Sequence, residues 1–183
     1  MIIVEGPDGA GKTTLIKRLQ REFGLEVAPR VVTKNAEAMV DLKTWVTQNL
    51  AEGFQYKIFD RHRLISEYIY GPLLSKKQEP GFTDLIWSYI QLNRPYNSVQ
   101  PVIIYCLPPL EVVRANVLAD HENAVVAPHI DAMYTAYVHR ASLDWLRKDG
   151  RTIIYDYTTD GQEENPLAIF KNLINYAKER ANQ

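Results

Sequence analysis

A phosphate-binding loop is encoded near the start of the chain. Residues 6–13 read Gly-Pro-Asp-Gly-Ala-Gly-Lys-Thr and match the pattern GxxxxGK(S/T) in full. Glycines let backbone amides approach phosphate oxygens closely. The Lys12 side chain can then reach the β- and γ-phosphates of a nucleoside triphosphate, and the Thr13 hydroxyl can ligate magnesium. The residues expected to contact the donor are Gly6, Pro7, Gly9, Ala10, Gly11, Lys12, Thr13 and Thr14.

A second polar motif, Asp60-Arg61-His62, directly follows an apolar run at residues 56–59. Ligands of open α/β sheets bind outside the carboxyl ends of the strands, so this motif should lie near the phosphates. The Asp60 carboxylate could hold magnesium, directly or through water. The planar guanidinium of Arg61 suits a second phosphate group. His62 is expected to pack or to form a hydrogen bond rather than to catalyse.

Short apolar runs alternate with helical stripes along the whole chain. Strands are expected at Ile2–Val4, Leu25–Val32, Tyr56–Phe59, Val102–Tyr105 and Thr152–Tyr155. Helices are expected from residue 12, over 39–50, from 66, over 83–94, from 110, over 130–145 and over 165–177, with a loop at 72–82. This alternation predicts a single α/β domain over residues 1–183, with a five-stranded, mainly parallel sheet and helices on both faces.

The overall charge favours no polyanionic partner, because 21 basic side chains nearly balance 22 acidic ones. We therefore expect a small nucleotide as the partner and no nucleic acid. The single cysteine, Cys106, cannot form an internal disulfide, which fits a reducing compartment. No signal peptide precedes the loop, and no apolar run approaches the roughly 20 residues of a membrane span. The expected location is cytoplasmic, with no membrane association.

The two motifs together resemble the thymidylate kinase family. The loop segment Glu5–Leu15 looks like that family's P-loop, and Asp60-Arg61-His62, followed by Ser66-Glu67 and Gly71, resembles its DR(Y/H) segment. The resemblance implies a three-layer P-loop fold that transfers phosphate from ATP, with Mg2+, to a deoxynucleoside monophosphate. It also implies catalytic roles for Lys12, Asp8, Arg61 and Arg114. Asp8 would contact the acceptor sugar and phosphate region, Arg61 would grip the acceptor phosphate, and Arg114 would lie against adenine.

The chain departs from that family at several positions. Arg30 is the substitute for a missing arginine-proline-glycine signature, and either Tyr68 or Tyr70 is the candidate for a tyrosine beside the acceptor sugar. A short lid is expected at about residues 115–135, but residues 115–138 contain no arginine or lysine. Either Arg114 or Arg140 would then cover the transferring phosphoryl group, or the lid works differently.

Three functions remain open at this point. A monophosphate kinase, with thymidylate as the first candidate acceptor, needs no strong general base because its acceptor oxygen is already ionised. A deoxynucleoside kinase needs a carboxylate base, and Thr33-Lys34-Asn35 supplies none after the second strand. A regulatory nucleotide-binding module usually carries an asparagine-lysine-x-aspartate motif, which the late strands lack. A homodimer is compatible with the aromatic helix at 83–94, which could be core or interface.

Overall fold

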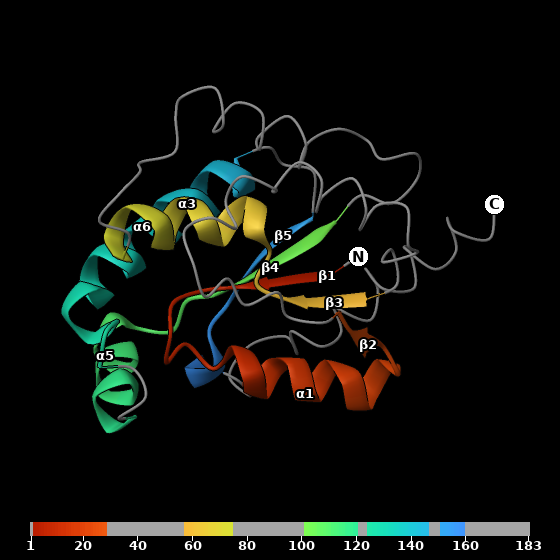
Figure 1. The fold of residues 1–183 in the computed structure, drawn as a ribbon. Helices are drawn as coiled ribbons and strands as arrows, with labels where there is room; N and C mark the ends of the chain where they lie inside the picture. Colours follow the sequence, from red (N-terminus) through yellow and green to blue (C-terminus); the bar gives the residue numbers. More distant parts are fainter. Residues whose placement is uncertain (1, 29–56, 75–100, 121–123, 147–150, 160–183) are drawn as a thin grey trace.

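The computed structural model describes residues 2–28, 57–74, 101–120, 124–146 and 151–159. Along the chain, the elements in these ranges are β1 (Ile2–Glu5), α1 (Lys12–Phe23), β2 (Glu26–Val27), β3 (Lys57–Asp60), α3 (Arg63–Leu74), β4 (Val102–Cys106), α5 (Leu110–Ala119), the 3-10 helix η4 (Ala127–His129), α6 (Ile130–Trp145), β5 (Thr152–Tyr155) and the 3-10 helix η5 (Tyr157–Thr159). The expected alternation of strands and helices is confirmed for these ranges (Figure 1).

The five strands form one sheet in the order β2-β3-β1-β4-β5, and every pairing is parallel. The predicted five-stranded parallel sheet is therefore correct. All five strands end at the same edge, so the loop after β1 and the motif after β3 meet there.

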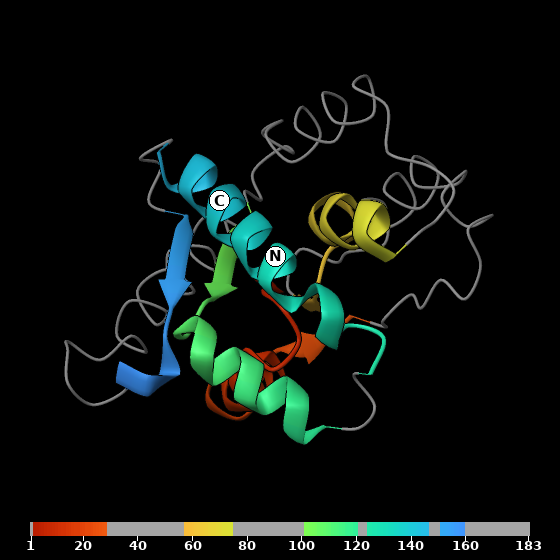
Figure 2. The ribbon, with the colours of Figure 1, turned by 90° about the vertical axis from the view of Figure 1, so that its left-hand side faces the viewer.

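The sheet carries helices on both faces, and the period of two along each strand determines which residues each face presents. Ile2 and Val4 pack on the face that α1 covers, together with Leu15 and Leu19. Ile3 points the opposite way, into a second core that includes residues of α3 and α6. Figures 1 and 2 show α1 on one side of the sheet and α3 and α6 on the other. The fold is thus the predicted three-layer P-loop fold.

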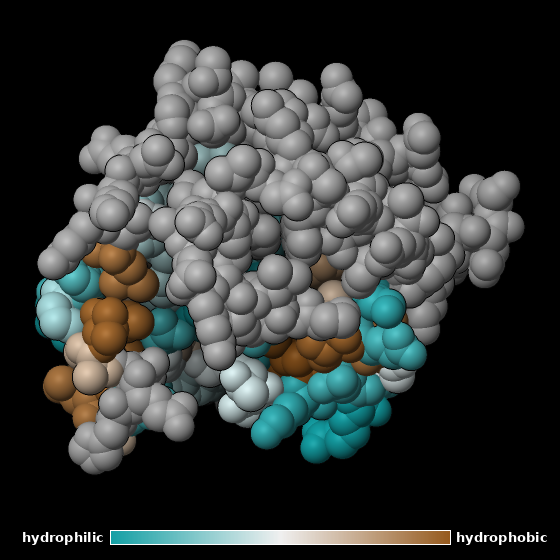
Figure 3. Space-filling view, in the orientation of Figure 1, coloured by the Kyte–Doolittle hydropathy of each residue, from teal (hydrophilic) through white to brown (hydrophobic). Residues whose placement is uncertain are grey.

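Helix α1 is amphipathic, as expected from its sequence. Leu15, Ile16 and Leu19 are buried against the sheet, whereas Lys17 and Arg21 are exposed. The space-filling view shows the outer surface of α1 as hydrophilic, with apolar residues between it and the sheet (Figure 3). Gly24 ends the helix in a left-handed conformation, and its N–H donates to the Gln20 carbonyl at 2.9 Å.

Three local expectations differ from the structure. The loop expected from residue 72 begins later, because α3 continues through Pro72 to Leu74. The helix expected from residue 66 begins earlier, at Arg63. Among the described residues, the second strand comprises only Glu26–Val27. The helices expected at 39–50, 83–94 and 165–177 lie outside the described residues.

The region expected to form a lid, at about residues 115–135, comprises the end of α5, η4 and the start of α6. Its described residues include Val117, Ile130 and Met133, which are buried in the two cores. These three side chains anchor the region to the sheet, and any closing movement must occur around them. None of the helices among the described residues is long and apolar enough to cross a membrane.

The loop after β1 requires glycine at its first position. Gly6 has φ +142°, and a Cβ added there would lie 2.5 Å from the Cys106 carbonyl oxygen. Gly24 also has a positive φ, +65°, but a Cβ there would meet no described atom within 4 Å. An alanine at position 24 would therefore pay only the cost of the backbone conformation, whereas an alanine at position 6 would also meet a steric clash.

We expect Gly24→Ala to lower the free energy of unfolding by about 1 kcal/mol, the cost of a left-handed conformation. Gly6→Ala should lower it by at least about 2 kcal/mol, because overpacking against β4 adds to the backbone cost. Urea unfolding of both variants would test this difference. Equal losses would mean that the end of β4 moves freely away from the loop.

Candidate active site

The sheet edge opens into a cavity of about 770 Å3 above the phosphate-binding loop. It lies where parallel strands end, as expected for ligand sites in this class of fold. The lining residues come from the loop, α1, the end of β3, α5 and the segment around β5: Asp8, Gly9, Gly11, Lys12, Thr13, Thr14, Leu15, Arg18, Asp60, Arg61, Asn116, Asp120, Tyr155 and Tyr157. The two predicted motifs, at residues 6–13 and 60–62, therefore share one cavity.

Lys12 begins α1, directly after Gly11 in a left-handed conformation. Its side chain is only 8% exposed, and its Nζ donates to the Pro7 carbonyl at 2.5 Å. Burial, together with the nearby Arg61, lowers the pKa of Lys12 to about 8. A buried ammonium group beside free helix amides is an anion-binding arrangement, because a bound phosphate would favour the charged form of the lysine.

Asp60 reaches the cavity because of the strand register. In the register of the two strands, Ile2 pairs with Ile58 and Val4 pairs with Asp60. Ile2, Val4 and Ile58 all belong to the core on the α1 side. Asp60 therefore lies on the same face of the sheet as the loop and α1. Its carboxylate and the Thr13 hydroxyl both line the cavity, and such hard oxygen ligands suit Mg2+ completed by phosphates and water. The donor set fits the magnesium site predicted from the sequence.

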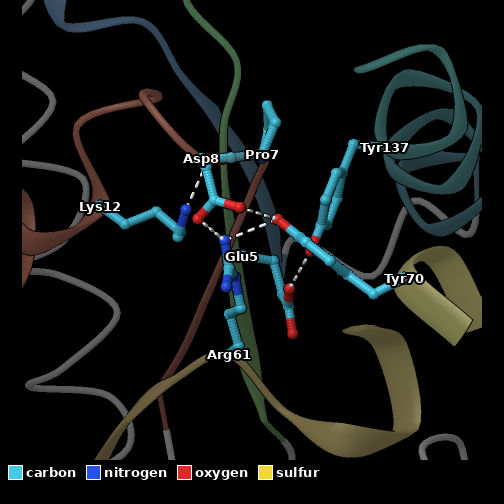
Figure 4. Close-up of polar contacts among 7 residues, drawn as sticks. All are labelled: Glu5, Pro7, Asp8, Lys12, Arg61, Tyr70 and Tyr137. Carbon is cyan, nitrogen blue, oxygen red and sulfur yellow. Dashed lines mark hydrogen bonds and ion pairs between the residues drawn. The ribbon is translucent and has the colours of Figure 1, made fainter. Parts of the chain in front are cut away.

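A tight polar cluster joins the two motifs (Figure 4). Arg61 forms an ion pair with Asp8 and donates to the Tyr70 hydroxyl at 2.6 Å. The Tyr70 hydroxyl donates in turn to Asp8 Oδ2 at 3.0 Å, and the Arg61 guanidinium lies 4.5 Å from the centre of the Tyr70 ring. Burial alone would raise the pKa of Asp8, but Arg61 and Lys12 hold it below its ordinary value. Asp8 is therefore an anion in the folded protein.

Arg61 has an unusual backbone and an incompletely used side chain. Its φ is +65°, the one positive φ at a non-glycine residue among the described residues. Its Nε is buried and has no hydrogen-bond partner within the described part of the chain. A buried guanidinium N–H without an acceptor is costly, so an acceptor on a ligand would complete the environment of Arg61.

Glu5 lies beneath this cluster and is completely buried. Oε1 accepts from the backbone N–H of His62 at 2.6 Å. Oε2 accepts from the Tyr137 hydroxyl at 3.0 Å (Figure 4). Burial raises the pKa of Glu5 to about 7, against the opposing effects of the His62 N–H, Arg61, Tyr137 and Lys12. The His62 side chain is buried edge-to-face on Phe59, 5.2 Å between ring centres, in agreement with the packing role expected for it.

The structure brings together only some of the residues expected around the acceptor. Tyr70, not Tyr68, is the tyrosine that contacts Asp8 and Arg61. Arg114 is exposed and forms a two-point pair with Asp131 of α6, at 2.8 and 2.5 Å, outside the lining of the cavity. Arg30 lies outside the described residues. Arg140 donates to the buried Asp144 at 3.1 Å in a network with Tyr105.

Several cavity and support residues were not expected from the sequence. Asn116 of α5 donates to the Gly9 carbonyl at 2.8 Å and to the Tyr157 hydroxyl at 2.9 Å, and the Tyr157 ring packs on Gly11. These contacts hold the loop against α5 and η5. Glu5 had a weak signal, since it is an acidic residue at the end of an apolar strand. Tyr137 lies in the helix expected over 130–145, and its contact with Glu5 had no signal in the sequence.

Comparison with known proteins places the fold. No protein-family model and no curated protein sequence matches the chain. The YorR protein from Bacillus subtilis, solved in complex with phosphorylated GDP, is similar in structure with a TM-score of 0.62 and 15% identity, over 100% of this chain and 98% of that one. Deoxyadenosine kinase from M. mycoides is similar with TM-scores of 0.55 with bound dCTP and 0.54 with bound dATP. The dCTP complex is 15% identical over 98% of this chain and 100% of its own, and the dATP complex is 17% identical over 93% and 97%. At such identities the likeness establishes the fold.

The buried Glu5 should make stability depend on pH. Its pKa rises from 4.5 to about 7 on folding, so the folded protein keeps a proton that the unfolded chain releases. This bound proton adds to the free energy of unfolding. The added stability is complete below pH 4.5 and is lost as the pH rises through about 7, a decrease of about 3 kcal/mol. Glu5→Gln removes this titration. Urea unfolding at several pH values should show wild type losing that amount relative to Glu5→Gln across the window, and parallel profiles would contradict a raised pKa.

Proposed function

We propose that this protein is an ATP-dependent nucleoside monophosphate kinase that acts on a deoxynucleotide, with thymidylate as the first candidate acceptor. The observation that carries the proposal is the meeting of two phosphate-binding devices in one cavity. Lys12 and the loop amides share this cavity with Arg61, which pairs with Asp8 and whose buried Nε has no partner among the described residues. A phosphoryl group passing between two anionic substrates needs such a paired arrangement.

On the donor side, the loop amides and Lys12 would bind the β- and γ-phosphates of ATP. Thr13 and Asp60 would hold Mg2+, which when bound neutralises developing charge on the phosphate oxygens. The loop is fixed before binding, because Asn116 donates to the Gly9 carbonyl and the Tyr157 ring lies against Gly11. Arg114 would reach adenine only by exchanging its pair with Asp131. Movement of the 115–135 region would accompany that exchange.

On the acceptor side, Arg61 would hold the monophosphate through two parallel hydrogen bonds. Asp8 and Tyr70 orient the guanidinium and offer polar contacts for the sugar. The attacking phosphate oxygen is already ionised, so the reaction needs positioning and charge neutralisation more than a general base. This suits Asp8, whose carboxylate is held in an ion pair with Arg61 rather than left free to take a proton.

A second candidate is a deoxynucleoside kinase. The resemblance in fold to deoxyadenosine kinase from M. mycoides favours it. Its acceptor is a neutral hydroxyl, which requires a carboxylate positioned as a general base. Three described carboxylates line the cavity: Asp8 is paired with Arg61, Asp60 is the proposed metal ligand, and Asp120 lies at the end of α5. The choice between the two activities therefore depends on whether the acceptor already carries a phosphate.

A substrate panel would decide between these activities. We expect phosphorylation of a pyrimidine deoxynucleoside monophosphate when deoxynucleosides and their monophosphates are assayed with ATP and Mg2+. Free nucleosides should react poorly, because they carry no phosphate for the Arg61 guanidinium to bind. Transfer to free nucleosides alone would establish the second candidate. ATP binding without transfer to any member of the panel would favour a regulatory module.

Variants of the two cations should separate the donor and acceptor sides. Lys12→Ala should abolish transfer, because the described loop contains no other cation. Arg61→Ala should lower kcat/KM for the monophosphate by roughly two orders of magnitude, and Arg61→Lys should recover only part of it because lysine lacks the planar fork. ATP affinity of Arg61→Ala, measured by calorimetry, should change little.

Arg21→Ala is the matched control, since Arg21 is an exposed cation on α1 outside the cavity. This variant should leave both the kcat/KM for the monophosphate and the ATP affinity unchanged. A collapse of ATP binding in Arg61→Ala, with the acceptor KM untouched, would reverse the assignment of the two sides.

A further inference from the structure

We propose that Glu5 is a positioning residue for the acceptor side: its buried carboxylate fixes the peptide after Arg61 and thereby aims the Arg61 guanidinium. The inference rests on the proposed function for the role of Arg61, but its geometry is independent of that function. Glu5 itself lines no part of the cavity, so its effect must pass through Arg61.

The backbone on both sides of Arg61 is anchored to β1. The Arg61 N–H donates to the Val4 carbonyl at 2.9 Å, which continues the sheet. The next N–H, that of His62, donates to Glu5 Oε1 at 2.6 Å. Two consecutive amides are thus bonded to two consecutive residues of the neighbouring strand. This arrangement holds the peptide units on either side of the Arg61 Cα.

The conformation that these bonds impose is unfavourable by itself. Arg61 has φ +65°, and a left-handed conformation costs a non-glycine residue roughly 1–2 kcal/mol. Such a conformation persists when surrounding contacts determine it. A buried N–H that loses its acceptor costs roughly 1–3 kcal/mol, which favours keeping the buried hydrogen bond from His62 to Glu5. Without it, the chain after β3 could relax to a negative φ and carry the guanidinium away from Asp8 and Tyr70.

The Glu5 carboxylate is itself held by a residue of α6. Glu5 follows Val4 along β1, so it points to the face occupied by Ile3, α3 and α6. There the Tyr137 hydroxyl of α6 donates to Oε2 at 3.0 Å. Figure 4 shows Tyr137 and Tyr70 approaching from α6 and α3, on the same side as the Glu5 carboxylate. Each oxygen of Glu5 therefore has a separate partner, and the group cannot rotate without losing one of them.

Stability alone does not explain a charged group at this position. Glu5 is 0% exposed and belongs to a layer of apolar side chains, where a hydrophobic residue of similar volume is often as stable or more stable. What an apolar side chain cannot supply is an acceptor for the His62 N–H. The function of the carboxylate is thus local control of the Arg61 backbone.

Kinetics of variants with and without the acceptor oxygen test the proposal. Glu5→Met keeps the volume but removes both oxygens, and it should lower kcat/KM for the monophosphate identified in the substrate panel by about ten- to a hundredfold, the range for a buried N–H left without an acceptor. Glu5→Gln keeps an amide oxygen for the His62 N–H and should recover most of that loss. ATP affinity should change by less than about threefold in both.

A double-mutant cycle separates positioning from general support of the fold. In an Arg61→Ala background, Glu5→Met should cost less than about threefold more in kcat/KM, because the side chain that it positions is already absent. Tyr105→Phe is the control: Tyr105 pairs with Glu5 in the sheet register, but its hydroxyl donates to Asp144. It should lower stability and leave acceptor kinetics unchanged. Additive losses in the cycle, or an equal loss in Tyr105→Phe, would overturn the proposal.

A crystal structure of Glu5→Met distinguishes failure of this inference from failure of the proposed function. We expect residue 61 to leave the positive-φ region, or its guanidinium to leave Asp8. If both stay as they are in wild type, the positioning role is wrong, whatever the enzyme phosphorylates. If they move but no monophosphate in the panel is phosphorylated, the positioning role stands and the proposed acceptor class is wrong.

Discussion

The hydrogen bonds that join the ends of β1 and β3 are the constraint on which the site depends. They connect Val4 and Glu5 to Arg61 and His62, immediately before the phosphate-binding loop and immediately after the third strand. Because the two strands are parallel and paired in register, their ends lie at the same height on the sheet. The loop that follows β1 and the arginine that follows β3 must therefore meet, and Asp8 and Arg61 form their ion pair where they do.

The two halves of the site, to which the proposed function assigns donor and acceptor, are supported in different ways. The donor half is built from backbone: glycines with positive φ allow the loop to turn, and Cys106, Asn116 and Tyr157 leave it little space to relax. The acceptor half is built from side chains on three elements, since Arg61, Tyr70 and Tyr137 come from the end of β3, α3 and α6. A backbone site tolerates few substitutions at its glycines. A side-chain site can be altered one hydrogen bond at a time.

The sequence predicted those features that a local pattern determines. The loop, the five strands within the described residues, and the pairing of Lys12 with Asp60 and Arg61 in one cavity all follow from contiguous motifs and from the rule that parallel strands end together. Residues such as Glu5, Asn116 and Tyr157 were missed because each looks ordinary within its own element. Their roles depend on register and on the packing of distant helices. The choice of Tyr70 over Tyr68 required the rotational phase of α3, which a one-residue ambiguity in alignment leaves open.

The contacts around Arg61 explain how Asp8 and Tyr70 can hold its guanidinium while leaving donors for a ligand. A guanidinium has five N–H donors, of which the Asp8 and Tyr70 contacts use a single terminal nitrogen. The buried Nε therefore remains as a donor that points to no described acceptor. Asp8 neutralises the guanidinium before a ligand arrives, which lowers the cost of keeping a buried cation. Under the proposed function, an incoming phosphate would share the arginine with Asp8, or displace Asp8, without a change in the backbone around Arg61.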